Sequence, residues 1–540
     1  MAVLSFVLYV VENKFEILYK SSELIKEVDF PNFLPIFEME MSDRDNMFIK
    51  AISRHAKTIP KRFANETDMK LIILAMTDNS FFDMALNLYM TSFKRFNITN
   101  FLFVGAGNIA CRSLLELNIQ CFYFTEDKNS NESNLFGSLK FVRKMNIRTD
   151  MIIKALRANF SVLHTDIDVV FLNNPMPYVE KSLKAFNMAI LWDYSVYNAG
   201  FLAIKPTQFS LEVYLEMQYK TNKSASLDDQ TALNSAIGHL RKKYKNNPQF
   251  SSVGVLDKSK FLCGKSYYEV VDRNFPTNNG SNNCPGCLVV HNNWIVTMEA
   301  KVYRFKESLM WVVDKNGYYS DNEKKYLLYN NPYLTSPPAN FSTEVEELNA
   351  LKTAFALAQM LNRTLILPRF HCLGPKNPRE CSILHWVYVR TLDAFFEYRE
   401  NSFLSNALVP QSIKKDLSQQ CPYGTKQIKI SIKENLCSPK LKNDTTGCLE
   451  PVWNFIDTKD SMMFNDLVRY SFDRGVSLNF RNYSQIPERE LLNLLNGCDD
   501  QVLYVASLLG VQVVFDEKST SEKFNAKIKD GIKRKNYLQY

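Results

Sequence analysis

The chain alternates short, continuous apolar runs with longer segments in which apolar residues recur at helical spacing. The apolar runs lie at 70–76, 101–104, 120–124 and 188–193, and helical segments lie at 84–93, 109–117 and 134–158. Strands that alternate with helices are typical of α/β proteins, and apolar runs without alternation indicate strands buried on both faces of a largely parallel sheet. The pattern therefore predicts an α/β fold whose ligands bind beyond the carboxyl ends of the strands.

Residues 162–172 contain two apolar runs that flank the acidic pair Asp166 and Asp168. We interpret this stretch as a buried strand that delivers both acids to its end. Because residues i and i+2 of an extended chain point the same way, the two carboxylates can face one point in space. Such oxygen ligands suit Mg²⁺ or Mn²⁺, whereas solvated loop or turn residues are the ordinary alternative for an Asp-X-Asp sequence.

Two further polar stretches follow predicted elements. The loop that begins with Thr77 and Asp78 comes directly after the strand at 70–76 and is a candidate for contacting a nucleotide, with a helix cap as the alternative. Asp228 and Asp229 open a predicted helix at 227–234, where acids also satisfy free backbone N–H groups and the helix dipole. Capping therefore remains open for both pairs of residues.

Length and turn signals predict more than one domain. A chain of 540 residues exceeds the size at which a single core is expected. Residues 1–67 show no clear period and form an expected lead-in or stem, residues 68–320 hold the first α/β domain, and Asn330 to Pro338 is rich in turn residues. Apolar patterns at 344–361, 364–368, 501–505 and 511–515 predict an α/β accessory domain over 330–540.

Charge and cysteine content restrict the partners and the cellular compartment that are expected for the protein. The net charge of +8 is spread over 65 basic and 57 acidic residues, which gives no argument for nucleic acid as a partner. Eleven cysteines and ten Asn-X-Ser/Thr sequons favour a secretory-pathway lumen. The CPGC sequence at Cys284 to Cys287 has no second such pair after it, so a local disulfide is the preferred interpretation over a zinc or redox pair.

The amino terminus begins with an apolar run, Met1 to Val11. This run is shorter than the roughly 20 apolar residues of a membrane-spanning helix, and it lacks a basic leader and a small-residue cleavage site. A clipped signal or membrane anchor and a first strand remain open for it.

An ordered set of motifs resembles a known family. The set consists of Asp166 to Pro175, Asn198 to Phe201, Asp229-Gln230 with Asn234, and His291 to Trp294 followed by Lys301. In this order they resemble the nucleotide-diphospho-sugar transferase domain of glycosyltransferase family 77, over roughly residues 68–306. The resemblance implies a GT-A fold, which has a mostly parallel nucleotide-sugar-binding sheet. In this chain the α/β accessory domain follows it at the carboxyl-terminal side.

The same resemblance implies roles for individual residues. Asp166, Asp168 and the distant His291 would hold Mn²⁺ or Mg²⁺ against the donor diphosphate, and Lys301 would neutralise that diphosphate as it leaves. Thr77 and Asp78 would contact the nucleotide, and Lys154 the donor phosphate or the sheet edge. The sugar and acceptor pocket would be lined by Asp193, Asn198, Asp229 and Gln230, with Asp193, Asp229 and Gln230 as the candidate catalytic groups.

The implied reaction is retaining transfer of a sugar from a UDP-sugar to a glycan or glycoprotein acceptor, in the Golgi or another secretory lumen. Retention requires a carboxylate nucleophile or front-face attack, and the residues do not decide between them. UDP-galactose, UDP-xylose and UDP-arabinose all fit the motifs. A catalytically silent sugar-nucleotide or glycan-binding protein and a phosphate-ester hydrolase remain as alternatives.

Overall fold

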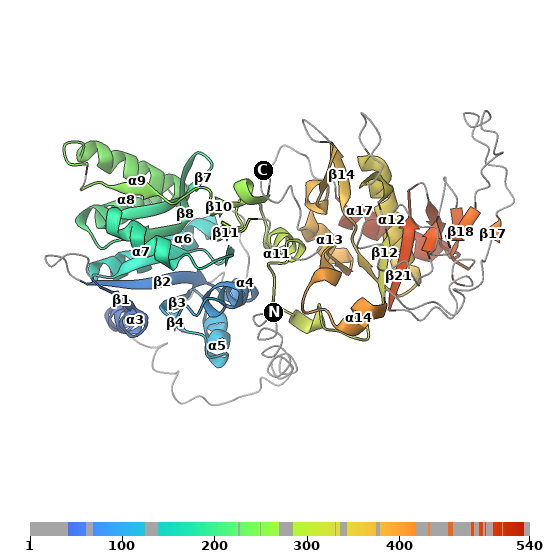
Figure 1. Ribbon diagram of the computed structural model, residues 1–540, viewed down its shortest axis with the longest axis horizontal. Coiled ribbons are helices and arrows are strands. Elements are labelled where there is room, and N and C mark those ends of the chain that lie inside the picture. Colours follow the sequence, from blue (N-terminus) through green and yellow to red (C-terminus); the bar gives the residue numbers. More distant parts are fainter. Residues whose placement is uncertain are drawn as a thin grey trace.

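The structure is a computed structural model (Figure 1). It describes residues 41–60, 68–124, 139–224, 227–248, 250–268, 284–329, 331–334, 343–373 and 378–416 and, beyond these, only 430–431, 452–456, 477–479, 485–489, 492, 501–509 and 511–533. The amino-terminal apolar run and most of the carboxyl-terminal cysteines lie outside the described residues.

The main sheet has eight strands in the order β4-β3-β2-β5-β8-β7-β9, with β1 paired to β2. The strands are β1 (Lys57–Ile59), β2 (Met69–Thr77), β3 (Phe101–Gly105), β4 (Cys121–Tyr123), β5 (Ser161–Thr165), β7 (Met188–Asp193), β8 (Val196–Ile204) and β9 (Val253–Val255). All neighbours along the main order are parallel except β8, which runs antiparallel to both β5 and β7. The predicted α/β fold with a mostly parallel sheet is confirmed.

Helices cover both faces of this sheet (Figure 1). Leu71 and Ile73 of β2 belong to the core on the side of α4 (Phe82–Leu88) and α7 (Met176–Ala185). Ile72 and Leu74 belong to the opposite core, which contains α3 (Met41–His55), α6 (Leu139–Arg157), α8 (Gln208–Lys223) and α9 (Asp229–Lys243). Successive residues of β2 thus enter different cores, which explains why its apolar run lacks alternation.

A second, three-stranded sheet lies next to the carboxyl end of β5. Its order is β10-β11-β6, formed by β10 (Phe261–Cys263), β11 (Val289–His291) and β6 (Val169–Phe171). The prediction of one continuous strand over 162–172 is therefore wrong. The chain leaves the main sheet after Thr165 and joins the small sheet at Val169, because β11 supplies a pairing edge for β6.

The carboxyl-terminal part contains a seven-stranded sheet with the order β16-β13-β12-β21-β19-β18-β17. Its strands are β12 (Tyr326–Tyr329), β13 (Thr364–Ile366), β16 (Tyr398–Arg399), β17 (Ile430–Ser431), β18 (Val452–Ile456), β19 (Ser477–Asn479) and β21 (Val502–Ser507), and its helices include α12 (Glu344–Met360), α13 (Val389–Phe395) and α17 (Lys518–Gly531). The division of the chain into domains at the residues given above stays a prediction.

Helix α11 (Met298–Glu307) lies between the two large sheets (Figure 1). Phe305 of this helix shares one buried cluster with Tyr326, Ile366 and Phe403 of the carboxyl-terminal part. Ser402 also donates to the carbonyl oxygen of Lys306 at 3.0 Å. The helix therefore packs against both parts. Among the described residues no helix is long and apolar enough to cross a membrane.

Candidate functional site

Asp166 and Asp168 lie in the short connection between the two sheets. Asp166 follows the last residue of β5, and Asp168 precedes the first residue of β6. The backbone N–H of Asp166 donates to the carbonyl oxygen of Gly200 at 2.6 Å, which fixes the point where the chain leaves the main sheet. The acidic pair is therefore held at the carboxyl edge of the parallel strands, where ligands of such sheets bind.

Pairing between β6 and β11 brings His291 to the acidic pair. In the antiparallel register His291 lies opposite Val169, the residue after Asp168, and the N–H of Asn292 donates to the carbonyl oxygen of Asp168 at 2.8 Å. The His291 Nε2 atom lies 3.3 Å from Oδ1 of Asp168 and 3.6 Å from Oδ2 of Asp166. One ligand atom from each of the three residues lies within 4.8 Å of the others.

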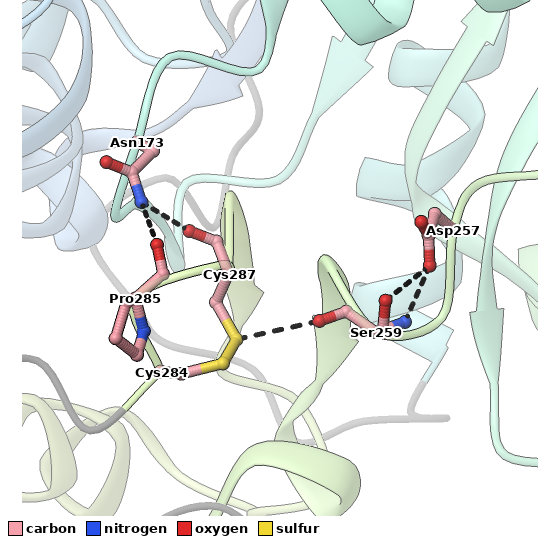
Figure 2. Close-up of a disulfide and its surroundings, with 6 residues drawn as sticks. All are labelled: Asn173, Asp257, Ser259, Cys284, Pro285 and Cys287. Atoms are coloured by element: carbon pink, nitrogen blue, oxygen red, sulfur yellow. Dashed lines mark hydrogen bonds between the residues drawn. A yellow bond between two sulfur atoms is a disulfide. The ribbon is translucent and has the colours of Figure 1, made fainter.

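A disulfide loop precedes β11 and anchors it (Figure 2). Cys284 and Cys287 are bonded to each other, as the CPGC sequence led us to expect. The Asn173 Nδ2 atom, just beyond β6, donates to the carbonyl oxygens of Pro285 at 3.2 Å and Cys287 at 2.8 Å. These contacts tie the loop to the end of β6, so they help to fix the register that places His291.

Gly200 forms the wall behind this cluster. A Cβ atom at position 200 would overlap the Asp166 carboxylate and would lie 2.6 Å from Cε1 of His291. Contacts this short are not tolerated by carbon atoms, so only glycine leaves both side chains where they are. Gly200 is part of the motif that carried the family resemblance, although the sequence alone did not assign it a role.

Two cations balance the charge of the acidic pair. The Arg148 Nη1 atom lies 2.6 Å from Oδ1 of Asp166, and the Lys301 Nζ atom lies 2.6 Å from Oδ2 of Asp168. Burial alone would raise the pKa of each aspartate, but Arg148 beside Asp166 and Lys301 beside Asp168, together with His291, hold both pKa values well below their usual range. The same carboxylates raise the pKa of His291 against the effect of its burial. Both aspartates are therefore ionised, as metal ligands must be.

The donor set fits a divalent cation. Two carboxylates and one imidazole combine hard oxygen ligands with a nitrogen ligand that Mn²⁺ also accepts. The cluster formed by Asp166, Asp168 and His291 is the one group of this kind found among the described residues.

Helix α6 presents basic side chains toward the sheet edge. Lys144 and Arg148 are four residues apart and thus lie on one face of the helix. The Lys144 Nζ atom lies 2.5 Å from Oδ2 of Asp78, where both side chains are buried. Burial nonetheless raises the pKa of Asp78 above its ordinary value. Lys154 lies on another face and forms ion pairs with Asp150 and Asp45, so among the described contacts it does not reach the cluster.

Asp78 also has the capping role that was the alternative for it. Its Oδ1 atom accepts from the backbone N–H of Ser80 at 2.9 Å and of Phe81 at 3.2 Å, at the start of the 3₁₀ helix η1 (Asn79–Phe81). Thr77 is buried at the end of β2, next to β5 in the sheet. Because β2 and β5 are parallel, Thr77 and Asp166 leave the sheet at the same edge.

Asp193, at the end of β7, is the acceptor in a buried hydrogen-bond network. Its Oδ1 atom accepts from Asn293 Nδ2 at 3.0 Å and from Trp294 Nε1, and its Oδ2 atom accepts from Asn198 at 3.2 Å and from Gln230 at 3.0 Å. Burial would raise the pKa of Asp193, but these donors outweigh it and hold the pKa below the ordinary value. Four donors saturate the carboxylate and fix its orientation.

Asp228 and Asp229 have different partners. Asp228 is the N-cap of α9 and accepts from the N–H of Thr231 at 2.9 Å, so the capping interpretation is confirmed for it. Asp229 is buried and forms an ion pair with Nη2 of Arg148. Arg148 therefore joins Asp229 to Asp166. Arg148 had no role in the sequence analysis, although its spacing from Lys144 on one helical face was a usable signal.

The amino-terminal part is thus an α/β unit whose mostly parallel sheet carries ionised carboxylates at its carboxyl edge, where ligands of such sheets bind, next to Lys144 and Arg148 of α6. Residues 97–305 match the family model described as nucleotide-diphospho-sugar transferase. This stretch is therefore a nucleotide-diphospho-sugar transferase domain, which confirms the resemblance stated from the sequence.

Two curated proteins of Arabidopsis thaliana are similar to the chain. "Arabinosyltransferase XEG113" is 22% identical over 379 residues, covering 58% of this chain and 57% of that protein. "Arabinosyltransferase RRA2" is 23% identical over 265 residues, covering 42% of this chain and 60% of that protein. The matches thus span less than two thirds of either relative.

Solved structures of glycosyltransferases show some likeness to the chain. The galactosyltransferase LgtC, in complex with donor and acceptor sugar analogues, is 14% identical with a TM-score of 0.28, covering 41% of this chain and 86% of that one. Mouse xyloside xylosyltransferase 1 is 11% identical with a TM-score of 0.25, covering 42% of this chain and 98% of that one.

Proposed function

We propose that the protein is a metal-dependent, retaining glycosyltransferase that moves a sugar from a UDP-sugar to a glycan or glycoprotein acceptor. The observation that carries this proposal is the convergence of Asp166, Asp168 and His291 within 4.8 Å, with Lys301 paired to Asp168. The match of residues 97–305 to nucleotide-diphospho-sugar transferases supplies the substrate class.

Asp166, Asp168 and His291 would hold Mn²⁺ or Mg²⁺. A bound divalent cation supplies Lewis-acid stabilisation for the negative charge that develops on a leaving diphosphate. Lys301 lies beside the same cluster and acts on that charge as a second, fixed positive group. Asp78, which is paired with Lys144 at the neighbouring strand end, and Thr77 would contact the nucleotide.

The sugar-binding side of the site is assigned to Asp193, Asn198 and Gln230. Asn198 Nδ2 donates both to Asp193 and to Oε1 of Gln230, the latter at 3.1 Å, and the N–H of Gly200 donates to Asn198 Oδ1 at 2.8 Å. The network is thus linked to the wall of the metal cluster. Asp193 and Asp229 are the carboxylates available to a retaining mechanism. Each is held by donors or by Arg148, which favours a role in charge stabilisation and positioning.

Arabinose is the first donor sugar to test. Both curated relatives carry the name arabinosyltransferase, and UDP-arabinose is among the donors that the motifs admit. Because the matches cover only 57% and 60% of these two relatives, UDP-galactose and UDP-xylose stay as alternative donors.

The proposed setting is the lumen of the Golgi or another secretory compartment, with a membrane anchor at the amino terminus as an open alternative. Disulfides form and persist in oxidising compartments. The structure pairs Cys111 with Cys121 and Cys284 with Cys287, and it leaves Cys263 as a buried free thiol.

A screen of UDP-sugars for Mn²⁺-dependent hydrolysis tests the proposal without knowledge of the acceptor. We expect one UDP-sugar to be turned over with Mn²⁺ and none with a chelator present. Binding of a UDP-sugar without any turnover would favour a catalytically silent protein. Hydrolysis that no acceptor can divert into transfer would favour a phosphate-ester hydrolase.

A further inference from the structure

Two aromatic residues beside the site adopt backbone conformations that bulky residues rarely take. Tyr194 has φ 60° and Trp294 has φ 58°, both in the left-handed region. Such a conformation is strained and persists only where the surrounding structure enforces it, often at functional sites. The two rings lie edge to face, with centroids 6.4 Å apart and planes at 74°. They form a right-angled aromatic corner.

The corner is held by residues of the proposed sugar site. Trp294 Nε1 donates to Oδ1 of Asp193, and Trp192 Nε1 donates to the carbonyl oxygen of Tyr194 at 2.9 Å. Tyr194 directly follows Asp193 in the chain, and Trp294 lies three residues after His291. The aromatic corner is therefore continuous with the metal cluster through Asp193 and β11.

The corner is open to solvent although it is rigidly built. Tyr194 is 63% exposed, and Trp294 is partly exposed. Contiguous apolar groups that stay exposed at a surface mark interaction sites and ligand-binding grooves. An exposed position also suits a chain-like ligand that extends outward from the buried residues Asp193 and Asn198.

A lysine completes the corner. The Lys265 Nζ atom lies 4.3 Å from the centroid of the Tyr194 ring and 5.0 Å from that of Trp294. No carboxylate partner of Lys265 is found in the part of the chain that the structure describes. Its ammonium group therefore has N–H donors available to a ligand that rests on the rings.

We infer that Tyr194, Trp294 and Lys265 bind a sugar ring of the acceptor, so that the acceptor is a saccharide chain. This inference rests on the proposed function and names the substrate class of the same site. The apolar C–H face of a pyranose or furanose ring packs on an aromatic face, while its hydroxyl oxygens accept from the ammonium group of Lys265. The diphosphate of the donor is assigned to the metal cluster and Lys301.

The test compares transfer and donor hydrolysis in three tyrosine variants. Tyr194→Ala removes one wall of the corner, and Tyr194→Phe keeps its aromatic face. Tyr219→Ala is the matched control, because Tyr219 is 57% exposed and has Lys223 4.4 Å from its ring centroid, but it lies on α8. The acceptors are arabino-, galacto- and xylo-oligosaccharides, with a Ser- and Thr-containing peptide as the sugar-free acceptor.

We expect Tyr194→Ala to raise the KM for the oligosaccharide acceptor about tenfold, the size of one aromatic contact, while UDP-sugar hydrolysis without acceptor stays unchanged. Tyr194→Phe and Tyr219→Ala should leave both parameters unchanged. An unchanged acceptor KM in Tyr194→Ala, or transfer to the peptide alone, would overturn the inference.

Failure of the proposed function is distinguishable from failure of the inference. If the wild-type protein turns over no UDP-sugar, the proposed function fails. Titration calorimetry with the same oligosaccharides then decides the inference by itself. Binding that Tyr194→Ala weakens and Tyr194→Phe retains supports the aromatic corner as a saccharide site, and absence of binding overturns it.

Discussion

Lys301 Nζ lies 2.6 Å from Oδ2 of Asp168, although 133 residues separate the two in the chain. The contact joins helix α11 to the connection between the two sheets. Asn292, the residue directly after His291, strengthens this link, because its Nδ2 atom donates to the carbonyl oxygen of Lys301 at 2.9 Å. The strand that supplies the imidazole and the helix that supplies the ammonium group are thus fixed to each other around one carboxylate.

Replacing this carboxylate should abolish metal-dependent transfer. Asp168→Asn keeps the shape of the side chain but removes a charged ligand, so we expect activity with Mn²⁺ to fall by at least roughly 10²-fold while the fold persists. Sugar transfer assays and circular dichroism measure the two effects. Asp83→Asn is the control, since Asp83 also pairs with a lysine, Lys315, but at the surface. Full activity of Asp168→Asn would reject the metal assignment.

A single methyl group at position 200 should have a similar effect for a steric reason. Gly200→Ala places a Cβ atom against the Asp166 carboxylate and the His291 ring, so the cluster must open. We expect loss of Mn²⁺ binding by calorimetry and loss of turnover. Gly238→Ala is the matched control, because a Cβ atom there meets nothing within 4 Å and the residue lies within α9, where alanine is favoured by roughly 0.5–1 kcal/mol. Unimpaired Mn²⁺ binding by Gly200→Ala would contradict the described geometry.

Arg148 should contribute strongly to stability because it joins two carboxylates. Arg148→Gln leaves Asp166 and Asp229 without their shared partner, and such a change in a buried pair costs about 3–5 kcal/mol. Urea unfolding measures the loss. Adding Asp229→Asn should recover part of it, since one of the uncompensated charges is removed. Equal unfolding midpoints for the wild type and Arg148→Gln would show that the bridge is not formed in solution.

Glu347 should make stability depend on pH. Burial raises its pKa from 4.5 to about 7, although His371 N–H and Asn331 Nδ2 donate to its carboxylate. The folded state therefore binds the proton more tightly than the unfolded state, and the free energy of unfolding falls as the pH rises from 4.5 to 7.

Glu347→Gln removes this dependence. Its stability relative to the wild type should increase across the same pH window, by on the order of 1–3 kcal/mol in chemical denaturation. Glu522→Gln, at an exposed pair with Lys518, should show no such trend. A stability difference for Glu347→Gln that does not change with pH would disprove the raised pKa.

The parallel part of the main sheet was predictable because its strands are buried on both faces. The runs at 70–76 and 101–104 have no alternation, and they correspond to β2 and β3, each of which has a neighbouring strand on both sides. The direction of β8 was not predictable in this way. Its pairing with β5 and β7 depends on contacts between distant segments, and its apolar composition is the same in either direction.

The candidate site was predictable only where chemistry leaves a local signal. Asp166, Asp168 and His291 stood out by residue type and order, and the structure places them together. The change of sheet between β5 and β6 was missed because it depends on β11, which lies more than a hundred residues later. Arg148 was overlooked in favour of Lys154, since only the three-dimensional position of α6 decides which of its faces meets the strands. The Cys111–Cys121 disulfide was likewise not foreseen.

Electron spin-echo spectroscopy of the Mn²⁺-loaded protein tests the central claim most directly. An imidazole nitrogen bound to Mn²⁺ modulates the echo, so the wild-type protein should show ¹⁴N modulation. The His291→Ala variant should lose it, whereas His164→Ala, which removes the other buried histidine near Asp166, should retain it. Modulation that persists in His291→Ala, or that is absent from the wild type, would contradict the account of this site.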